Sequence, residues 1–191
     1  ASGATAAASV AELGAQCDLV GVCVVDDAGV AAICRELIPA MRPGSVIAIH
    51  ATITPDSCVT LAAQCAARGI SLIDAPVSGG DIGARNATLT VMVGGEASAL
   101  ERAMPVLQAM GKTITHVGGP GAGQVAKAAN QIMVAAQMVA MGELLVFAKK
   151  AGVDPRKVVD AIKGGAAQCW SLDVKPPRLF DGNRNPGFKA H

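Results

Sequence analysis

The sequence predicts an α/β fold, in which part of a doubly wound parallel sheet is followed by an all-helical second domain that begins with a long interdomain helix. Three short apolar runs, at residues 17–25, 45–49 and 70–74, have the length of strands and alternate with helical patterns. Continuous apolar runs are typical of strands buried on both faces, as in parallel sheets joined by crossover helices. Past residue 152 no strand-like run remains.

Turn residues and charges mark the ends of these elements. The first strand stops at Asp26-Asp27, and the next helix stops at Arg42-Pro43-Gly44, because proline and glycine both disfavour a continued helix. A later helix starts at Asp154-Pro155, a typical capping pair. In chain order we expect a helix near 10–15, a strand at 17–25, a helix at 28–41, a strand at 45–49, a helix at 55–68, strands at 70–74 and 89–93, a helix at 96–110, a strand at 113–117, the long helix, and a helix from 155 to 163.

The domain boundary is expected near Gly118. Residues 1–118 then form the partial α/β domain, and residues 119–191 form the start of the helical one. In doubly wound sheets ligands bind beyond the carboxyl ends of the strands. Residues that follow three such ends are therefore predicted to lie together at a binding site: Asp26, Thr52 and the loop at 75–80.

The long helix is predicted to begin in a glycine-rich segment, Gly118-Gly119-Pro120-Gly121-Ala122-Gly123. Lys127 then falls within the first two turns and shares one helical face with Gly123, Asn130 and Gln131. Further along, apolar residues occupy nearly every side of the helix. This pattern predicts a helix that is buried inside the protein.

Lys127 has two interpretations. It could cap a surface end of the helix and extend its amine to water. Alternatively, it could enter a cleft as a proton donor or acceptor. There, partial burial and the positive end of the helix dipole would lower its pKa toward working pH, which makes a lysine useful in acid–base catalysis.

Composition excludes several classes of function. The net charge is +1, aromatic residues make up 2% and tyrosine is absent, so nucleic-acid binding is not expected. The most apolar stretch, 128–148, contains Asn130, Gln131, Gln137 and Glu143, which predicts a soluble helix and not a membrane span. No secretory leader is recognisable, and we expect a cytoplasmic protein.

The cysteines and histidines do not suggest a metal site. The six cysteines form no Cys-x-x-Cys pair and lie in apolar or helical segments, so we expect reduced packing residues. The three histidines lack the spacing of metal ligands.

Two motifs together resemble one family, the β-hydroxyacid dehydrogenases, which include 3-hydroxyisobutyrate dehydrogenase and tartronate semialdehyde reductase (2-hydroxy-3-oxopropionate reductase). Segment 74–80, Asp-Ala-Pro-Val-Ser-Gly-Gly, is similar to the family's substrate-binding signature. Segment 118–131, Gly-x-x-Gly-x-Gly-x-x-x-Lys-x-x-Asn-Gln, is similar to its catalytic signature. Glycine-rich loops are common, so the resemblance depends on both motifs occurring in this order on the predicted elements.

The resemblance implies hydride transfer between NAD or NADP and a short β-hydroxy acid or its semialdehyde. Lys127 would exchange a proton with the substrate oxygen, while Ser78 and the amides of Gly79 and Gly80 would hold the substrate carboxylate. Asn130 and Gln131 would orient the substrate from the same helical face as Lys127.

On the cofactor side, the resemblance assigns Thr52 to the nicotinamide end, and Val24 and Val25 to backbone beside the cofactor. Some positions depart from the family pattern: Val25 replaces a proline, Ala51 a serine, and Asn86-Ala87 stands where a glycine is usual. These departures concern local loop geometry more than the reaction.

The family's Rossmann-like sheet begins with a strand and a Gly-x-Gly-x-x-Gly turn that are not found in this sequence, and its last helices are not found either. We therefore expect an incomplete dinucleotide-binding domain that binds the cofactor weakly on its own. Exposed sheet edges would favour association, and we expect a homodimer or homotetramer.

Other classes remain as alternatives. A non-catalytic dehydrogenase-like binding or assembly module would lack the catalytic lysine, and a reductase of C=N bonds usually has Asp or Tyr at that position, so Lys127 argues against both. A hydrolase built on Ser78 or a cysteine would need a nucleophile elbow, and none is recognisable.

Overall fold

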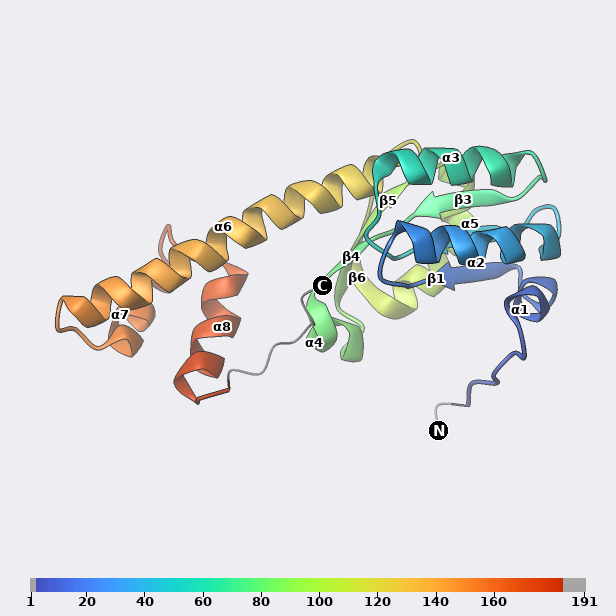
Figure 1. Ribbon diagram of the computed structural model, residues 1–191. Helices are drawn as coiled ribbons and strands as arrows, with labels where there is room; N and C mark the ends of the chain where they lie inside the picture. Colours follow the sequence, from blue (N-terminus) through green and yellow to red (C-terminus); the bar gives the residue numbers. More distant parts are fainter. Residues whose placement is uncertain (1–2, 184–191) are drawn as a thin grey trace. The chain divides into compact units, whose positions relative to one another are not determined.

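The computed structural model describes residues 3–183, which form two compact units that meet between Ala129 and Asn130. In the first unit, helices alternate with short strands (Figure 1). Its elements are α1 (Val10–Gln16), β1 (Leu19–Val22), α2 (Asp27–Ala40), β2 (Val46–Ile49), α3 (Pro55–Ala66), β3 (Ser71–Asp74), β4 (Val77–Ser78), α4 (Gly80–Arg85), β5 (Leu89–Gly94), α5 (Ala97–Met110), β6 (Gly111–Gly118) and the first turns of α6 (Ala122–Lys150).

The predicted fold class is confirmed, and the sheet is parallel over its first three strands. β1, β2 and β3 pair in parallel and in sequence order, with Val22 opposite Ile49 and Ile49 opposite Asp74. β5 then runs antiparallel to β3 and β4, and β6 runs parallel to β5. β4 and α4 lie between β3 and β5 in the chain, and β5 pairs with β3 at one position, Asp74 opposite Gly94.

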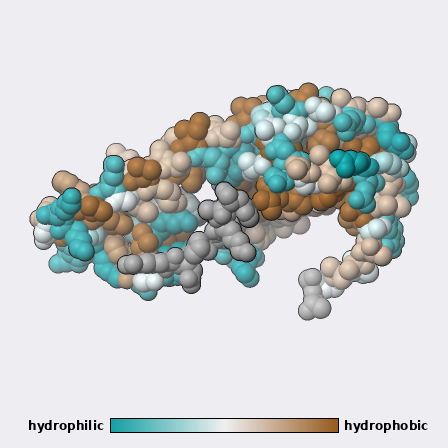
Figure 2. Space-filling model, in the orientation of Figure 1, coloured by the Kyte–Doolittle hydropathy of each residue, from teal (hydrophilic) through white to brown (hydrophobic). Residues whose placement is uncertain are grey.

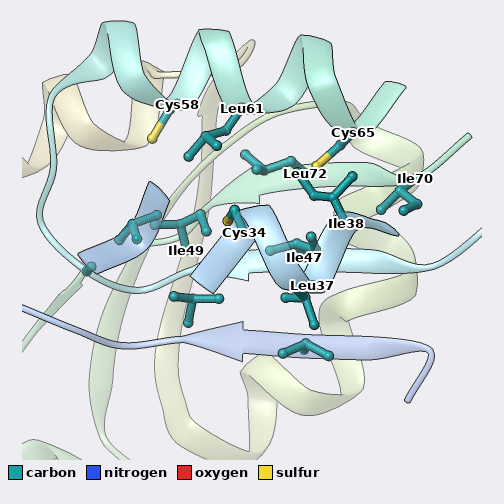
Figure 3. Packing of buried hydrophobic residues seen from close by; sticks show 14 of the residues in the cluster. Cys34, Leu37, Ile38, Ile47, Ile49, Cys58, Leu61, Cys65, Ile70 and Leu72 are labelled. Atoms are coloured by element: carbon teal, nitrogen blue, oxygen red, sulfur yellow. The ribbon is translucent and has the colours of Figure 1, made fainter. Parts of the chain in front are cut away.

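The sheet is buried on both faces, as its apolar strands predict. In β2, Ile47 and Ile49 contribute to a core with α2 and α3, while Val46 and Ala48 contribute to a second core with α5. The two sets alternate because successive side chains of a strand point to opposite faces. Figure 3 shows the first core, which includes the thiols of the buried cysteines Cys34, Cys58 and Cys65.

Side chains cap the helices that follow β1 and β2. The Asp26 carboxylate accepts a hydrogen bond of 2.8 Å from the Gly29 N–H at the start of α2. The Thr54 hydroxyl accepts one from the Ser57 N–H at the start of α3. These contacts satisfy N–H groups that a helix cannot pair internally, so both helices begin at the carboxyl edge of the sheet.

The described part of the second unit is helical. It contains α6 from Asn130 onward, α7 (Pro155–Ile162) and α8 (Trp170–Phe180). The α8 helix lies in a proline-rich stretch for which no element is predicted from the sequence. Its buried Ser171 donates a hydrogen bond of 2.9 Å to Gln137 of α6, and Arg156 of α7 donates one of 2.8 Å to the Phe180 carbonyl.

The burial predicted for α6 is wrong for the described chain. Ile132 is 71% exposed and Phe147 72% exposed, and apolar side chains are visible at the surface along this helix (Figure 2). Within residues 3–183, α6 is the one helix that is long and apolar enough to cross a membrane, a criterion that core helices of soluble proteins also meet. The apolar composition of a helix indicates that it packs against an apolar partner, but it does not indicate whether that partner is the same chain or another molecule.

Candidate active site

The start of α6 is fixed to the end of β3 by one buried carboxylate. Asp74 is fully buried; its Oδ1 accepts a hydrogen bond of 2.8 Å from the Gly121 N–H, and its Oδ2 accepts one of 2.9 Å from the Gln124 N–H. Both donors are N–H groups at the start of a helix, where the helix dipole also favours a negative charge. The two oxygens of the Asp74 carboxylate therefore fix the position of the first turn of α6.

Close packing explains two glycines of this junction. A Cβ on Gly123 would lie 2.5 Å from the Met92 carbonyl oxygen, and one on Gly94 would lie 2.5 Å from Asp74 Oδ1. Any larger residue at either position would push the helix away from the sheet. The glycine-rich segment thus brings the first turns of α6 against β3 and β5.

Lys127 lies in the second turn of α6, as predicted. Its Nζ donates a hydrogen bond of 2.8 Å to the Val77 carbonyl oxygen in β4. The side chain is partly buried, and this burial lowers the pKa of the Lys127 amine below its usual value. The amine therefore lies beside β4 and does not simply extend into solvent.

The segment that follows Val77 carries the residues expected to hold a carboxylate. Ser78 is partly buried in β4, opposite Thr90 of β5, and Gly79 precedes the first residue of α4. Gly79 and Gly80 have φ angles of +132° and +63°, conformations that favour glycine. These two residues turn the chain from β4 into α4 directly after the carbonyl that contacts Lys127.

The loop after β2 is tied to α6 by a buried amide. Gln124 is 2% exposed; its Nε2 donates a hydrogen bond of 2.8 Å to the Ala51 carbonyl, and its Oε1 accepts one of 3.2 Å from the Ile53 N–H. Thr52 lies between these two anchored residues and is exposed. The predicted nicotinamide-side residue therefore sits on a loop that is held from the helix bearing Lys127.

Val24 and Val25 lie after the carboxyl end of β1. Val24 is half-buried against the first core, and Val25 is exposed. Because β1, β2 and β3 are parallel, the segments after them leave the same edge of the sheet. The structure thus places the segments of Val24 and Thr52 at this edge, while Ser78 belongs to β4, which pairs with β5.

Asn130 and Gln131 follow Lys127 by three and four residues on α6. The Asn130 Nδ2 donates a hydrogen bond of 2.9 Å to Gln131 Oε1. Both residues belong to the second compact unit, and the helix alone relates them to Lys127. They share a face with it, as i, i+3 and i, i+4 residues do.

His50 is a further polar residue at this edge, and sequence reasoning gave it no role. Its Nδ1 lies 2.9 Å from the Ala75 carbonyl oxygen and must donate to it, because a carbonyl only accepts. Burial lowers the pKa of His50, although the hydrogen bond to Ala75 acts in the opposite direction. A polar residue directly after a buried strand is the signal that could have identified it.

A groove of about 520 Å³ lies between α2 and α3 and contains none of the predicted site residues. At one end Asp27 Oδ1 accepts hydrogen bonds from the hydroxyls of Ser57, at 2.5 Å, and Thr54, at 2.9 Å. The Ser57 hydroxyl is the main reason why the pKa of Asp27 is lowered. This cluster joins the starts of the two helices. No group of three or more metal-ligating side chains occurs between residues 3 and 183.

Comparison with protein families gives two matches. Residues 1–118 match the NAD-binding domain of 6-phosphogluconate dehydrogenase, and residues 121–191 match the NAD-binding domain of NADP-dependent 3-hydroxyisobutyrate dehydrogenase. Together they cover nearly the whole chain, and both are NAD-binding families.

Curated relatives are similar over part of their length. The chain is 46% identical over 146 residues to the 2-hydroxy-3-oxopropionate reductase of Escherichia coli, covering 76% of this chain and 50% of the relative. It is 39% identical over 142 residues to a probable 3-hydroxyisobutyrate dehydrogenase of Mycobacterium tuberculosis, covering 74% and 48%. The chain thus spans about half the length of these relatives.

Solved structures share the fold. The 3-hydroxyisobutyrate dehydrogenase of Mycobacterium tuberculosis, solved with L-serine, is 36% identical with a TM-score of 0.81, over 89% of this chain and 58% of that one. Psf3, solved in complex with NADP+ and 2-OPP, has a TM-score of 0.86 at 23% identity. The match covers 95% of this chain and 66% of Psf3. At that identity the likeness concerns the fold alone.

Proposed function

The chain belongs to the β-hydroxyacid dehydrogenase family, and on this premise we propose that it carries part of the active site of an NAD(P)-dependent dehydrogenase. The substrate would be a short β-hydroxy acid or its semialdehyde, of the 3-hydroxyisobutyrate or tartronate semialdehyde type. One observation carries the proposal: the amine of Lys127 is held at the Val77 carbonyl, one residue before Ser78-Gly79-Gly80.

Lys127 is proposed as the acid–base group. In oxidation its neutral amine would take the proton of the substrate hydroxyl while the carbon–hydrogen bond gives its hydride to the nicotinamide. In reduction its ammonium would return the proton to the carbonyl oxygen. A pKa lowered by burial supports this role, because proton transfer is most effective when the pKa lies near working pH.

Ser78, Gly79 and Gly80 are proposed to hold the substrate carboxylate. A hydroxyl and two backbone N–H groups are suitable donors to an anion, and the positive φ angles of the glycines turn the backbone sharply at this point. Asn130 and Gln131 would bind the polar substituents of the substrate from the Lys127 face of α6. Their side chains can donate as well as accept hydrogen bonds.

The cofactor supplies a hydride acceptor, and the described residues fit its nicotinamide end. Thr52 is exposed after β2, and Val24 and Val25 follow β1, the strand paired in parallel with β2. The starts of α2, α3 and α6 are not proposed for the pyrophosphate, because the side chains of Asp26, Thr54 and Asp74 already bind N–H groups there. The carboxylates at the starts of α2 and α6 would also repel phosphate groups, so these helix ends are assigned to structure.

The protein is proposed to be a cytoplasmic homodimer or homotetramer that binds small molecules and neither nucleic acid nor membranes. The exposed apolar residues of α6 support association, since monomers rarely expose large contiguous apolar surfaces.

The test uses the full-length protein that contains this chain. Oxidation of 3-hydroxyisobutyrate, glycerate and L-serine would be followed through the absorbance of reduced nicotinamide, with NAD and with NADP. A short alcohol without a carboxylate serves as the control, and it should not be oxidised. Cofactor binding without turnover of any β-hydroxy acid would instead support the non-catalytic binding module.

A further inference from the structure

The side chain of Gln124 is buried between two parts of the proposed site. It lies three residues before Lys127 on α6, and its amide reaches the loop of residues 51–53 that follows β2. Its backbone N–H is bound by Asp74 Oδ2, so both the main chain and the side chain of this residue are fixed.

The two side-chain bonds have a defined effect on Thr52. Gln124 donates to the residue before Thr52 and accepts from the residue after it, as a neighbouring strand would. Ala51 and Ile53 are buried, while Thr52 between them is exposed. The side-chain amide of Gln124 therefore fixes the backbone on both sides of Thr52 and, with it, the orientation of Thr52.

We propose that Gln124 is a positioning residue for hydride transfer, which sets the distance between the nicotinamide-side loop of residues 51–53 and the acid–base amine of Lys127. The inference rests on the proposed function, since it concerns how two parts of that site are kept in register. Reaction rates depend steeply on such spacing, and a displacement of about 1 Å can lower them about a hundredfold.

An uncharged amide is needed at this place. One atom must accept from the Ile53 N–H and another must donate to the Ala51 carbonyl, and a glutamine provides both. A methionine of similar length provides neither. A glutamate could provide both only when protonated, because its ionised form has no donor for Ala51.

The experiment compares three variants of the full-length protein: Gln124→Met, Gln124→Glu and Gln137→Met. The last is the matched control, since Gln137 also accepts a hydrogen bond from a buried group, Ser171, but lies more than three turns further along α6. For each variant we would measure kcat, KM for the hydroxy acid, the melting temperature, and hydrogen–deuterium exchange of the peptide covering residues 51–54.

Gln124→Met is expected to lower kcat about ten- to a hundredfold, with KM for the hydroxy acid within about threefold of the wild type. Amide exchange at residues 51–54 should rise. Gln137→Met should lower the melting temperature at most and leave kcat and this exchange unchanged. A change of stability without loss of kcat per folded site in Gln124→Met would overturn the proposal.

The Gln124→Glu variant adds a pH profile that a merely structural role would not produce. Burial raises the pKa of a carboxyl, so its kcat relative to the wild type should increase as pH falls. The titratable groups around this site are Asp74 of β3, Cys58 of α3, His50 beside Ala51, and Lys127 on α6, and all four are common to the variants. Burial chiefly raises the pKa of the Cys58 thiol to about 12, outside the assay range.

A constant ratio of activities across pH would contradict the inference, even if Gln124→Met fails to fold. If the proposed function itself were wrong, the result would differ, because the wild-type protein would then oxidise no β-hydroxy acid. The exchange measurement still decides in that case, because unchanged exchange at residues 51–54 in both Gln124 variants would show that the amide does not hold the loop.

Discussion

The amine of Lys127 and the carbonyl oxygen of Val77 are joined by a hydrogen bond of 2.8 Å, although fifty residues separate them in the chain. This contact brings the second turn of α6 to the first residue of β4, directly before Ser78. The carbonyl oxygen accepts a hydrogen bond from the lysine nitrogen and does not take its proton, so the bond orients the amine and leaves it able to exchange a proton with a substrate.

Replacing Lys127 by alanine should lower kcat of the full-length enzyme about 10²- to 10⁴-fold, the usual contribution of general acid–base catalysis. Cofactor affinity should stay nearly the same, because Thr52, Val24 and Val25 are not touched. Steady-state kinetics and a direct cofactor titration would measure the two effects. Lys149→Ala, in the last turn of α6, is the control and should keep full activity. Retention of kcat in Lys127→Ala would remove the assignment.

The rates of substrate oxidation and of the reverse reduction should depend on pH in opposite ways. Burial lowers the pKa of Lys127 from 10.5, and oxidation needs the neutral amine, so kcat/KM for oxidation should rise with pH along a limb centred below 10.5. Reduction needs the ammonium, and its kcat/KM should fall with pH over the same range. Both limbs should vanish in Lys127→Ala. Limbs that persist in that variant would belong to another group.

Ser78→Ala should raise KM for the hydroxy acid roughly ten- to a hundredfold and change kcat by less than about threefold. A hydrogen bond to a charged group contributes about 1.5–3 kcal/mol, and a carboxylate is held alike in ground and transition states. The control is Ser71→Ala, at the first residue of β3, which should leave both kcat and KM unchanged. If kcat of Ser78→Ala fell steeply at constant KM, the hydroxyl would take part in the chemistry.

The parallel part of the sheet could be predicted from the sequence because its strands are buried on both faces. The run around Val46–Ile49 is apolar at every position, and both faces of β2 are indeed covered. The start of α6 was predictable as well, since its glycines and Pro120 allow few other conformations. In both cases the local sequence pattern is sufficient to predict the structure.

Features that depend on partners distant in sequence were not predicted. β4 and α4 contain two and six residues, too few for a periodic pattern to be recognised, and so the antiparallel pairing of β4 with β5 was not predicted either. The bonds of Asp74 and Gln124 connect residues 47 to 73 positions apart, and both side chains look like ordinary polar residues in the sequence. The exposure of α6 depends on what covers it, which hydropathy does not specify.

Ala87→Gly should raise the free energy of unfolding by about 0.5–1 kcal/mol. Ala87 has a φ of +53° and is the one residue other than glycine with positive φ between residues 3 and 183. That conformation costs a non-glycine residue about 1–2 kcal/mol, of which the greater flexibility of glycine in the unfolded chain offsets part. Denaturant unfolding measures the change. The control Asn86→Gly, at a φ of −94°, should destabilise.

Self-association should depend on one face of α6. Four branched apolar residues recur there at seven-residue intervals, Val125, Ile132, Val139 and Val146, and all four are exposed. This spacing keeps them on one stripe, and the small residues Ala128, Ala135 and Gly142 beside it allow a second helix to approach closely. A second copy of the same helix is a suitable neighbour, because its stripe has the same spacing.

The double variant Ile132→Asp/Val139→Asp should therefore reduce the mass of the full-length protein in light scattering, from a dimer or tetramer toward a monomer. Each copy would have to bury two charges in the contact, at a cost that apolar packing cannot offset. Val59→Asp is the control, since Val59 is also exposed but lies on α3, outside the stripe, and the mass should not change. An unchanged mass in the double variant would exclude α6 as the contact. Binding of the wild-type protein to lipid vesicles, lost in the double variant, would assign the stripe to a membrane instead.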